Sequence, residues 1–325
     1  MKTFLTRRLP EMQRLAQADF SLDLWHGPEP PTYSELVAHT RGCDGILCLL
    51  TERIDADLLD AVGSQLKVVS QMAVGVDNID LEACTARGVP VGHTPGVLTE
   101  ATADLTLALM LTTARHLIEA AGDVKAGRWR TWDPLGWAGP DLFGSTVGIV
   151  GLGRIGAAVA RRLQGFDVEL LYHNPRSSRF AAEVGATLVD FDDLLARSDF
   201  VTLHNPYTPD THHLIDADSL AQMKSSAILI NAARGGVVDQ DALMAALRDG
   251  QIAAAGLDVT TPEPLPSDHP LLTLPNVVVL PHIGSASFSA RQNMAAIAID
   301  NLLAGLNGER LPHCANPSVY HGFDH

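Results

Sequence analysis

The chain has 325 residues, of which 46% are hydrophobic and 19% are charged, and its formal net charge is −15. This length is sufficient for two domains with substantial cores, and the composition is ordinary for a soluble globular protein. The negative charge argues against nucleic acid or an anionic membrane surface as a partner, because both require basic patches that the sequence lacks.

The N-terminal residues include several basic side chains, but no apolar run follows them that resembles a signal peptide or a membrane span. The four cysteines show neither CxxC spacing nor the density of a disulfide framework, so we expect reduced thiols. These features predict a cytoplasmic protein. Histidines such as His212 and His213 lack metal-ligand spacing with cysteine or aspartate, and we predict no metal site.

The first hundred residues alternate between short apolar runs and helical patterns. Strands are expected at 1–5, 20–25, 45–50 and 67–72. Helices are expected at 10–18, from about residue 34, at 56–62 and at 81–87. Such an alternation predicts a parallel sheet covered by helices on both faces.

Residues 99–121 change character, because a long Ala/Leu/Thr pattern here contains neither proline nor glycine. Threonine, aspartate and arginine interrupt it too often for a membrane span, so we expect one buried helix that crosses between two domains. A Pro/Gly-rich segment with Trp129, Trp132 and Trp137 follows and runs to Phe143. It is either a surface connection or a dimer arm, and its aromatic content favours a homodimer.

A glycine-rich turn lies in residues 145–156, STVGIVGLGRIG, where a β-branched run ends in glycine and a helical pattern begins. Gly151, Gly153 and Gly156 have the G-x-G-x-x-G spacing of dinucleotide-binding folds. This spacing lets the backbone turn tightly and approach a pyrophosphate at the helix N-terminus. Without its flanking strand and helix the same spacing would also fit a plain turn.

The residues beyond this turn bear on which dinucleotide binds. An NAD-binding fold carries a ribose-binding acid about 20 residues beyond the turn, and that position is Asn174, followed by Arg176 and Ser177. An acid would repel a 2′-phosphate, whereas a neutral amide followed by arginine and serine suits one. The pattern predicts NADP(H), with NAD(H) as the alternative cofactor; the competing interpretation is a polar surface turn.

Further strands are expected at 187–189, 200–204, 227–231, 254–259 and 277–280, with helices between most of them. This is sufficient for a doubly wound sheet of about six or seven strands. A last helix at 290–306 is long enough to return to the first domain. We therefore predict an α/β protein with a discontinuous substrate-binding domain, residues 1–98 and 287–325, and a Rossmann nucleotide-binding domain, residues 99–286.

Three polar residues follow strands in the second half of that sheet: Arg234, Glu263 and His282. Ligands of open α/β sheets bind at the carboxyl ends of the strands. Arginine offers a bidentate fork to a carboxylate, histidine transfers a proton near neutral pH, and the glutamate would hold the ring. Singly, each residue could also be a cap, a turn residue or a loop histidine.

The motifs GLGRIG, NAARGGVVDQDAL, AAAGLDVTTPEPLP, LPHIGSAS and MAVGVDNIDL together resemble the D-2-hydroxyacid dehydrogenase family. The similarity is greatest to its glyoxylate/hydroxypyruvate reductase branch and covers nearly the whole chain. The resemblance implies that His282 is the acid/base, that Glu263 is its partner and that Arg234 orients the substrate. It also implies that the backbone amides of Val74 and Gly75 bind the substrate carboxylate across the domain cleft.

By the same resemblance, further residues would line the cofactor beside the glycine turn. They are Arg154, Ile155, Thr102, Pro206, Thr211, Ala232, Asp258, His282 and Gly284. The implied reaction is the reduction of a small 2-oxo acid, glyoxylate or hydroxypyruvate, to the 2-hydroxy acid. The alternatives are a reductase for another 2-oxo acid and a non-catalytic dinucleotide sensor, or corepressor-like protein, on the same fold.

Overall fold

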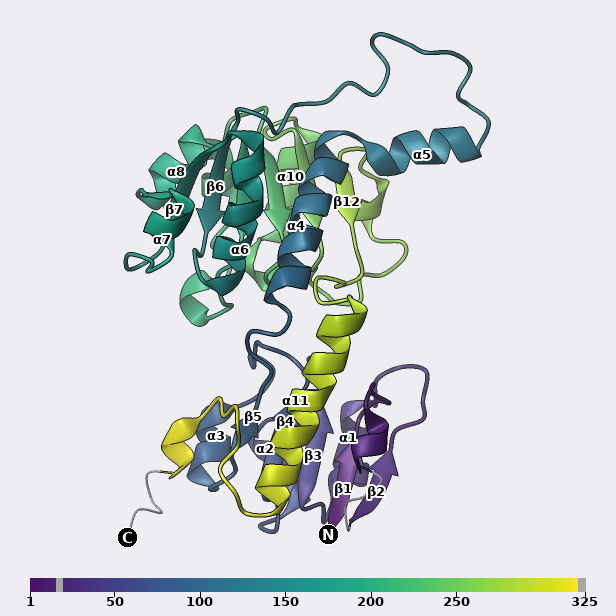
Figure 1. The fold of residues 1–325 in the computed structure, drawn as a ribbon. Coiled ribbons are helices and arrows are strands. Elements are labelled where there is room, and N and C mark those ends of the chain that lie inside the picture. Colours follow the sequence, from purple (N-terminus) through teal and green to yellow (C-terminus); the bar gives the residue numbers. More distant parts are fainter. Residues whose placement is uncertain (16–19, 321–325) are drawn as a thin grey trace. The chain divides into compact units, whose positions relative to one another are not determined.

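A computed structural model describes residues 1–15 and 20–320 of the chain (Figure 1). The chain divides into two compact units, and we call them unit 1, Met1–Leu98 with Ser287–His325, and unit 2, Thr99–Ala286. Both units are built on parallel sheets with helices on their faces, so the predicted α/β fold class is confirmed.

Unit 1 contains a five-stranded parallel sheet in the order β2-β1-β3-β4-β5, which is the flavodoxin-like order. Its strands are β1 Lys2–Leu5, β2 Ser21–Leu24, β3 Gly45–Cys48, β4 Val68–Gln71 and β5 Val91–Gly92. Every residue of β3 and β4 is buried. Burial of both side-chain faces explains why these central strands read as continuous apolar runs rather than alternating ones.

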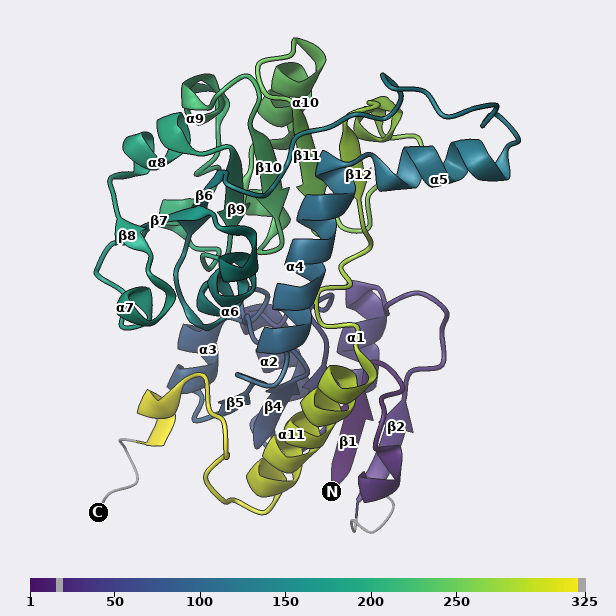
Figure 2. The ribbon, with the colours of Figure 1, turned by 45° about the horizontal axis from the view of Figure 1, so that its top comes forward.

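Four helices cover this sheet: α1 Tyr33–Thr40, α2 Ala56–Val62, α3 Leu81–Ala86 and α11 Phe288–Leu306. The first three share one core with the sheet, while α11 packs across β3 and β4 (Figures 1 and 2). Helix α11 approaches closely because Gly305 faces β4, where a methyl group would lie 2.4 Å from Val68 Cβ. The helix–sheet contact therefore depends on a residue without a side chain.

Unit 2 contains a seven-stranded parallel sheet in the order β12-β11-β10-β9-β6-β7-β8, which is the Rossmann order with one added strand. Its strands are β6 Thr146–Val150, β7 Glu169–His173, β8 Thr187–Leu188, β9 Phe200–Leu203, β10 Ile228–Asn231, β11 Ala254–Leu257 and β12 Val277–Val279. Since all the strands are parallel, their carboxyl ends lie on one edge of the sheet.

Helices α4 Thr99–Ala114, α6 Arg154–Leu163 and α7 Ala181–Val184 pack on one face of this sheet. Helices α8 Phe191–Arg197, α9 Ala217–Gln222 and α10 Gln240–Arg248 pack on the other face. Helix α5 Leu117–Lys125 and the loop after it project from the rest of unit 2 (Figures 1 and 2).

The prediction of one buried helix over 99–121 is wrong. The helix ends at Ala114, His116 adopts a left-handed backbone with φ of 51°, and α5 then starts in a new direction. No residue of α5 is buried, and Ile118 is 57% exposed. At the break Gly139 lies close to the end of α4, where a methyl group on it would lie 1.9 Å from the Ala114 carbonyl oxygen.

The helix expected at 10–18 is a 3₁₀ turn, Met12–Leu15, and residues 16–19 lie outside the described part. All four cysteines, Cys43, Cys48, Cys84 and Cys314, are described and none forms a disulfide. Within residues 1–15 and 20–320, no helix combines the length and the apolarity needed to cross a membrane.

Candidate functional site

The glycine turn joins β6 to α6 in unit 2, and its three glycines differ in the space available around them. Gly151 has φ of 96°, and a methyl group on it would lie 2.5 Å from the amide nitrogen of Asn205. A methyl group on Gly156 would lie 2.4 Å from the Gly151 carbonyl oxygen. Gly153 is exposed, and nothing lies within 4 Å of the position its methyl group would take. The turn is thus tightly packed behind Gly151 and open at Gly153.

The start of α6 fits a bound phosphate. The helix begins after Gly153, which has no side chain to cap it, and among the described residues no side chain forms a cap hydrogen bond at this N-terminus, where the amides of Arg154 and Ile155 lie. Free amides at the N-terminus of a ten-residue helix attract anions through their partial positive charge. The open face of Gly153 and these amides together form a cradle that suits a dinucleotide pyrophosphate.

Asn174, predicted to lie near the adenosine ribose, contacts the turn directly. Its side-chain oxygen accepts a hydrogen bond from the Leu152 amide at 2.8 Å, and Ser178 Oγ donates to the Leu152 carbonyl at 2.6 Å. The segment after β7 therefore fixes the glycine turn through both the amide and the carbonyl group of Leu152. Arg176 and Ser177, which follow Asn174, are exposed to solvent.

Arg234 follows β10 and is half-buried at the carboxyl edge of the sheet. Asn231, the last residue of β10, fixes the backbone that carries it: Asn231 Nδ2 donates to the Arg234 carbonyl at 2.9 Å. Gly235 follows, and a methyl group there would lie 2.0 Å from the Thr260 carbonyl oxygen. The loop after β10 therefore packs tightly against the loop after β11, which leads to Glu263.

His282 and Glu263 form a hydrogen-bonded pair, with 2.5 Å between His282 Nδ1 and Glu263 Oε1. The pair joins the loop after β11 to the loop after β12. Because carboxylate oxygens only accept hydrogen bonds, Nδ1 carries the proton, and Nε2 is the ring nitrogen that faces away from Glu263. The His282 side chain is 22% exposed, so the ring is accessible to a ligand.

Asp258 anchors the histidine loop through three consecutive amides. Its carbonyl accepts from the His282 amide at 2.9 Å, and its carboxylate accepts from Ile283 at 2.8 Å and from Gly284 at 2.7 Å. Burial raises the pKa of the Asp258 carboxyl, although the two amide bonds act in the opposite direction. This anchoring holds His282 with φ of 54°, a left-handed conformation that few residues adopt without support.

The other predicted cofactor residues of unit 2 lie at the same sheet edge or next to it. A methyl group on Gly284 would lie 3.4 Å from Thr102 Cγ2. Ala232 follows β10, and Thr211 Oγ1 donates to the Pro206 carbonyl at 2.8 Å in the loop after β9. Val74 and Gly75 belong to unit 1, where they follow β4.

His204 is a residue that the sequence did not single out. It follows β9, its Nε2 lies 3.0 Å from Thr202 Oγ1, and its Nδ1 is buried with no partner among the described residues. Desolvation lowers the pKa of His204 to about 4, so the ring is neutral at physiological pH. A single histidine after a strand gave no sequence signal that would distinguish it from the other histidines.

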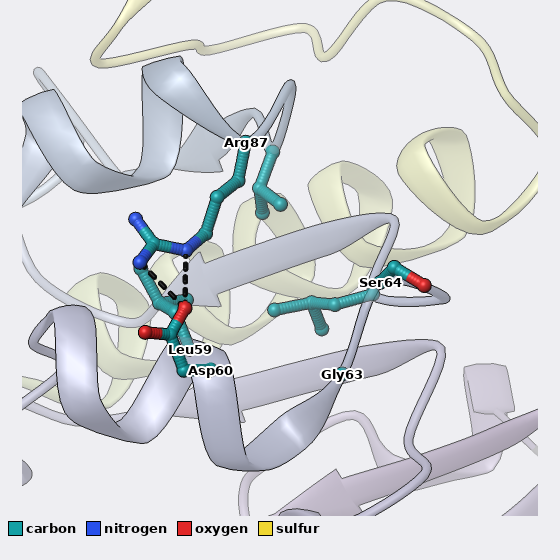
Figure 3. A pocket seen from close by; sticks show the side chains of 7 residues that line it. Leu59, Asp60, Gly63, Ser64 and Arg87 are labelled. Atoms are coloured by element: carbon teal, nitrogen blue, oxygen red, sulfur yellow. Dashed lines mark hydrogen bonds and ion pairs between the residues drawn. The ribbon is translucent and has the colours of Figure 1, made fainter.

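A cavity of about 330 Å³ lies in unit 1, away from the predicted residues (Figure 3). Its lining consists of Leu59, Asp60, Gly63, Ser64, Leu66, Arg87 and Val89. Arg87 and Asp60 pair with each other there at 2.6 Å. Among the described residues, no group of three or more His, Cys, Asp or Glu side chains is arranged to hold a metal ion.

Comparison with known proteins identifies the family. The family model described as "D-isomer specific 2-hydroxyacid dehydrogenase, NAD binding domain" matches residues 107–284. The Mus musculus protein named glyoxylate reductase/hydroxypyruvate reductase is 51% identical over 317 residues, which cover 96% of this chain and 97% of the mouse protein.

This chain belongs to the D-isomer specific 2-hydroxyacid dehydrogenase family.

Solved structures agree with this assignment. A Thermus thermophilus protein superposes with a TM-score of 0.91 at 45% identity and covers 97% of this chain and 100% of its own. A Sinorhizobium meliloti protein described as an NADPH-dependent glyoxylate/hydroxypyruvate reductase, solved with NADP and malonate, gives 0.85 at 33% identity, covering 98% and 97%. The predicted family and the prediction of an oxidoreductase are confirmed, and the cofactor class is a nicotinamide dinucleotide.

Proposed function

We propose that this dehydrogenase reduces glyoxylate, hydroxypyruvate or both to glycolate and D-glycerate with NADPH. The observation that carries the proposal is the 2.5 Å pair of His282 and Glu263 at the same sheet edge as Arg234. The names of the mouse and Sinorhizobium meliloti relatives support these substrates. In this proposal unit 2 binds the dinucleotide, unit 1 contributes to substrate binding, and the enzyme works in the cytoplasm.

His282 is the proton donor in the proposed reaction. When bound, a reduced nicotinamide would supply a hydride to the carbonyl carbon C2 of the substrate, which becomes the carbon of a primary alcohol in glycolate or of a secondary alcohol in D-glycerate. His282 Nε2, protonated in the acting form, donates its proton to the carbonyl oxygen, which balances the charge that the hydride brings. The imidazole is left neutral, with Nδ1–H still donating to Glu263.

Glu263 stabilises the charged form of the ring and fixes its orientation. A hydrogen bond between an imidazolium and a carboxylate is about twice as strong as one between neutral groups. Because Glu263 lies between two prolines in the loop after β11, its backbone has little freedom. The pair is therefore suited to present Nε2 in one direction.

Arg234 is the proposed anchor for the substrate carboxylate, since a guanidinium can donate two parallel hydrogen bonds to a carboxylate; in this structure Arg234 Nη1 donates to the Ala233 carbonyl at 2.9 Å. We also propose that the amide groups of Val74 and Gly75 bind the same carboxylate. Two kinds of donor on one carboxylate would fix the orientation of C2, and orientation supplies a large share of the rate of such reactions.

The proposed preference for NADPH depends on the segment after β7. Asn174 carries no charge that would repel a 2′-phosphate, and Arg176 and Ser177 are exposed beside it. The pyrophosphate would lie on Gly151, Gly153 and the first-turn amides of α6. The remaining cofactor contacts are assigned to Arg154, Ile155, Gly156, Thr102, Pro206, Thr211, Ala232, Asp258 and Gly284.

We also propose a homodimer that forms through α5 and the loop after it. Trp129 is 69% exposed, Trp132 is 80% exposed and Leu135 is 87% exposed. Exposed tryptophans and leucines gathered on one projecting segment are typical of an interaction surface. In the proposed dimer, contact with a second copy of the chain would shield these apolar side chains from water.

Initial rates test the proposal directly. Glyoxylate and hydroxypyruvate are each assayed with NADPH and with NADH by the absorbance of the reduced nicotinamide. Reduction of either acid with a strong preference for NADPH supports the assigned substrates and cofactor. A preference for NADH would refute the assigned 2′-phosphate site while leaving the His282 chemistry intact. Dinucleotide binding without turnover of either acid would refute the assigned substrates.

A further inference from the structure

The loop that follows β4, residues 73–78, has all of its first three carbonyl groups occupied within unit 1. The Thr94 amide donates to the Ala73 carbonyl at 2.8 Å. His93 Nδ1 lies 3.1 Å from the Val74 carbonyl, and Gln71 Nε2 donates to the Gly75 carbonyl at 2.6 Å. Since a carbonyl oxygen can only accept, His93 carries its proton on Nδ1.

The orientation of the Gln71 amide follows from Asn78. Asn78 Nδ2 lies within hydrogen-bonding distance of the Leu49 carbonyl at 3.2 Å and the Glu52 carbonyl at 2.8 Å, so this atom is the amino group. The same atom lies 2.8 Å from Gln71, which must therefore present its oxygen. The Gln71 amino group consequently faces the Gly75 carbonyl. Asn78 thus donates to the Gln71 oxygen, and the Gln71 amino group donates to Gly75.

Gln71 and His93, whose side chains donate to carbonyl groups of this loop, differ in burial. Gln71 is fully buried at the carboxyl end of β4, whereas His93 is half-buried after β5. A buried amide that makes hydrogen bonds through both its amino group and its oxygen resists rotation, because any other orientation breaks these bonds. Gln71 therefore acts as a rigid support for the loop.

The occupied carbonyl groups determine where the neighbouring amides point. In a trans peptide unit the C=O and the N–H groups point in opposite directions. The Ala73 carbonyl therefore directs the Val74 N–H away from its partner Thr94, and the Val74 carbonyl directs the Gly75 N–H away from His93. Within the described residues, neither of these two N–H groups donates to a protein acceptor.

We propose that Gln71 and His93 are positioning residues for the loop that presents the Val74 and Gly75 amides to a substrate carboxylate. His93 fixes the peptide unit that carries the Gly75 N–H, and Gln71 fixes the following peptide unit through the Gly75 carbonyl, so rotation about Gly75 is restricted on both sides. The inference rests on the proposed function, in which these amides receive that carboxylate. Asn78 donates a hydrogen bond to the Gln71 side-chain oxygen and so fixes the Gln71 amide. None of them touches the reacting atoms, and their effect reaches the substrate through the backbone.

Gln71→Met tests the inference, because methionine fills the same space without donating to Gly75. The measured quantities are kcat, KM for glyoxylate, the Kd of NADPH, the melting temperature, and the Kd of oxamate with NADPH bound. We expect KM and the oxamate Kd to rise about tenfold or more, as for loss of one hydrogen bond to a charged group. The NADPH Kd should stay unchanged and kcat should fall less than KM rises.

Gln65→Met is the matched control, because Gln65 Nε2 also donates to backbone carbonyls of unit 1, those of Cys43 at 3.1 Å and Val62 at 2.7 Å. This variant loses comparable bonds and should leave both KM and the oxamate Kd unchanged. His93→Phe is the second test variant should Gln71→Met fail to fold, since the half-buried His93 donates only to the loop carbonyl. It should raise the same two constants.

Folded Gln71→Met or His93→Phe with KM and oxamate Kd within about twofold of wild type would overturn the inference and leave the proposed function standing. Equal rises in Gln71→Met and Gln65→Met would assign the effect to lost stability and overturn it as well. If the wild-type enzyme binds NADPH but neither reduces glyoxylate nor binds oxamate, the proposed function itself has failed, and the inference fails with it.

Discussion

The glycine turn permits a prediction that separates stability from cofactor binding, through alanine substitutions at Gly151 and Gly153. At Gly151 the left-handed φ of 96° costs about 1–2 kcal/mol for any residue with a Cβ. The new methyl group would also lie 2.5 Å from a backbone nitrogen, which cannot move aside as a side chain can. Gly151→Ala should therefore lower the melting temperature by at least about 4 °C and also weaken NADPH binding.

Gly153→Ala should behave differently, because Gly153 has no left-handed φ and nothing lies within 4 Å of the new methyl group. Its effect on stability should stay within about 0.5 kcal/mol. The methyl group would nevertheless occupy the open side from which a pyrophosphate reaches the amides of α6. Loss of one charge-assisted hydrogen bond there costs about 1.5–3 kcal/mol, so the Kd of NADPH should rise roughly 10- to 100-fold.

The assay pairs thermal unfolding of the protein alone with NADPH titration followed by fluorescence. Gly165→Ala is the control, because it also has open space around the new methyl group and lies at the other end of α6. It should change neither quantity. A Gly153→Ala protein that binds NADPH as tightly as wild type would refute the assignment of the pyrophosphate to this turn.

Three further predictions concern single side chains. Glu263→Gln should lower kcat/KM about tenfold by weakening the bond to the protonated ring, whereas Asp239→Asn, which alters the pair with His213, should not change it. Arg176→Ala should raise the KM for NADPH about tenfold and leave that for NADH unchanged; equal effects on both would contradict a 2′-phosphate site. His204→Gln should reduce the pH dependence of the free energy of unfolding between pH 6.5 and 4. In this range His204 gains a proton only in the unfolded chain, because its pKa in the folded protein is about 4. On acidification over this range, the free energy of unfolding of the wild type should fall by about 3 kcal/mol more than that of the variant. Parallel curves of the free energy of unfolding against pH would refute a buried neutral ring.

Much of the fold followed from local patterns in the sequence. The central strands β3, β4, β9 and β10 are buried on both faces, and such strands appear as apolar runs that are hard to miss. The glycine spacing identified the turn before α6 because glycine is required at Gly151 by the backbone itself.

The break between α4 and α5 could not be predicted locally, because the segment contains no glycine or proline. At the break His116 has a left-handed backbone, and Gly139, from a later part of the chain, packs against the Ala114 carbonyl. The bond from Leu152 to Asn174 was hidden for the same reason: counting residues beyond the turn located the position but not its contact with the turn. Tertiary contacts override local preference in both places.

The candidate site shows a similar division. Arg234, Glu263 and His282 could be proposed from the sequence because they follow strands whose carboxyl ends share an edge. Gln71 and Asn78 gave no signal, since a buried amide that supports a loop has the same letters as one on the surface. Only the directions of their hydrogen bonds identify them.

The central claim is that His282 transfers a proton during reduction of a 2-oxo acid, and the most direct test compares wild type with His282→Ala. The measurement is kcat with glyoxylate under saturating NADPH, together with the Kd of NADPH for each protein. We predict that kcat falls by a factor of about 100 to 10,000, the usual contribution of a general acid, while the NADPH Kd changes far less than kcat. A variant that turns over glyoxylate at a rate near that of wild type would contradict the account.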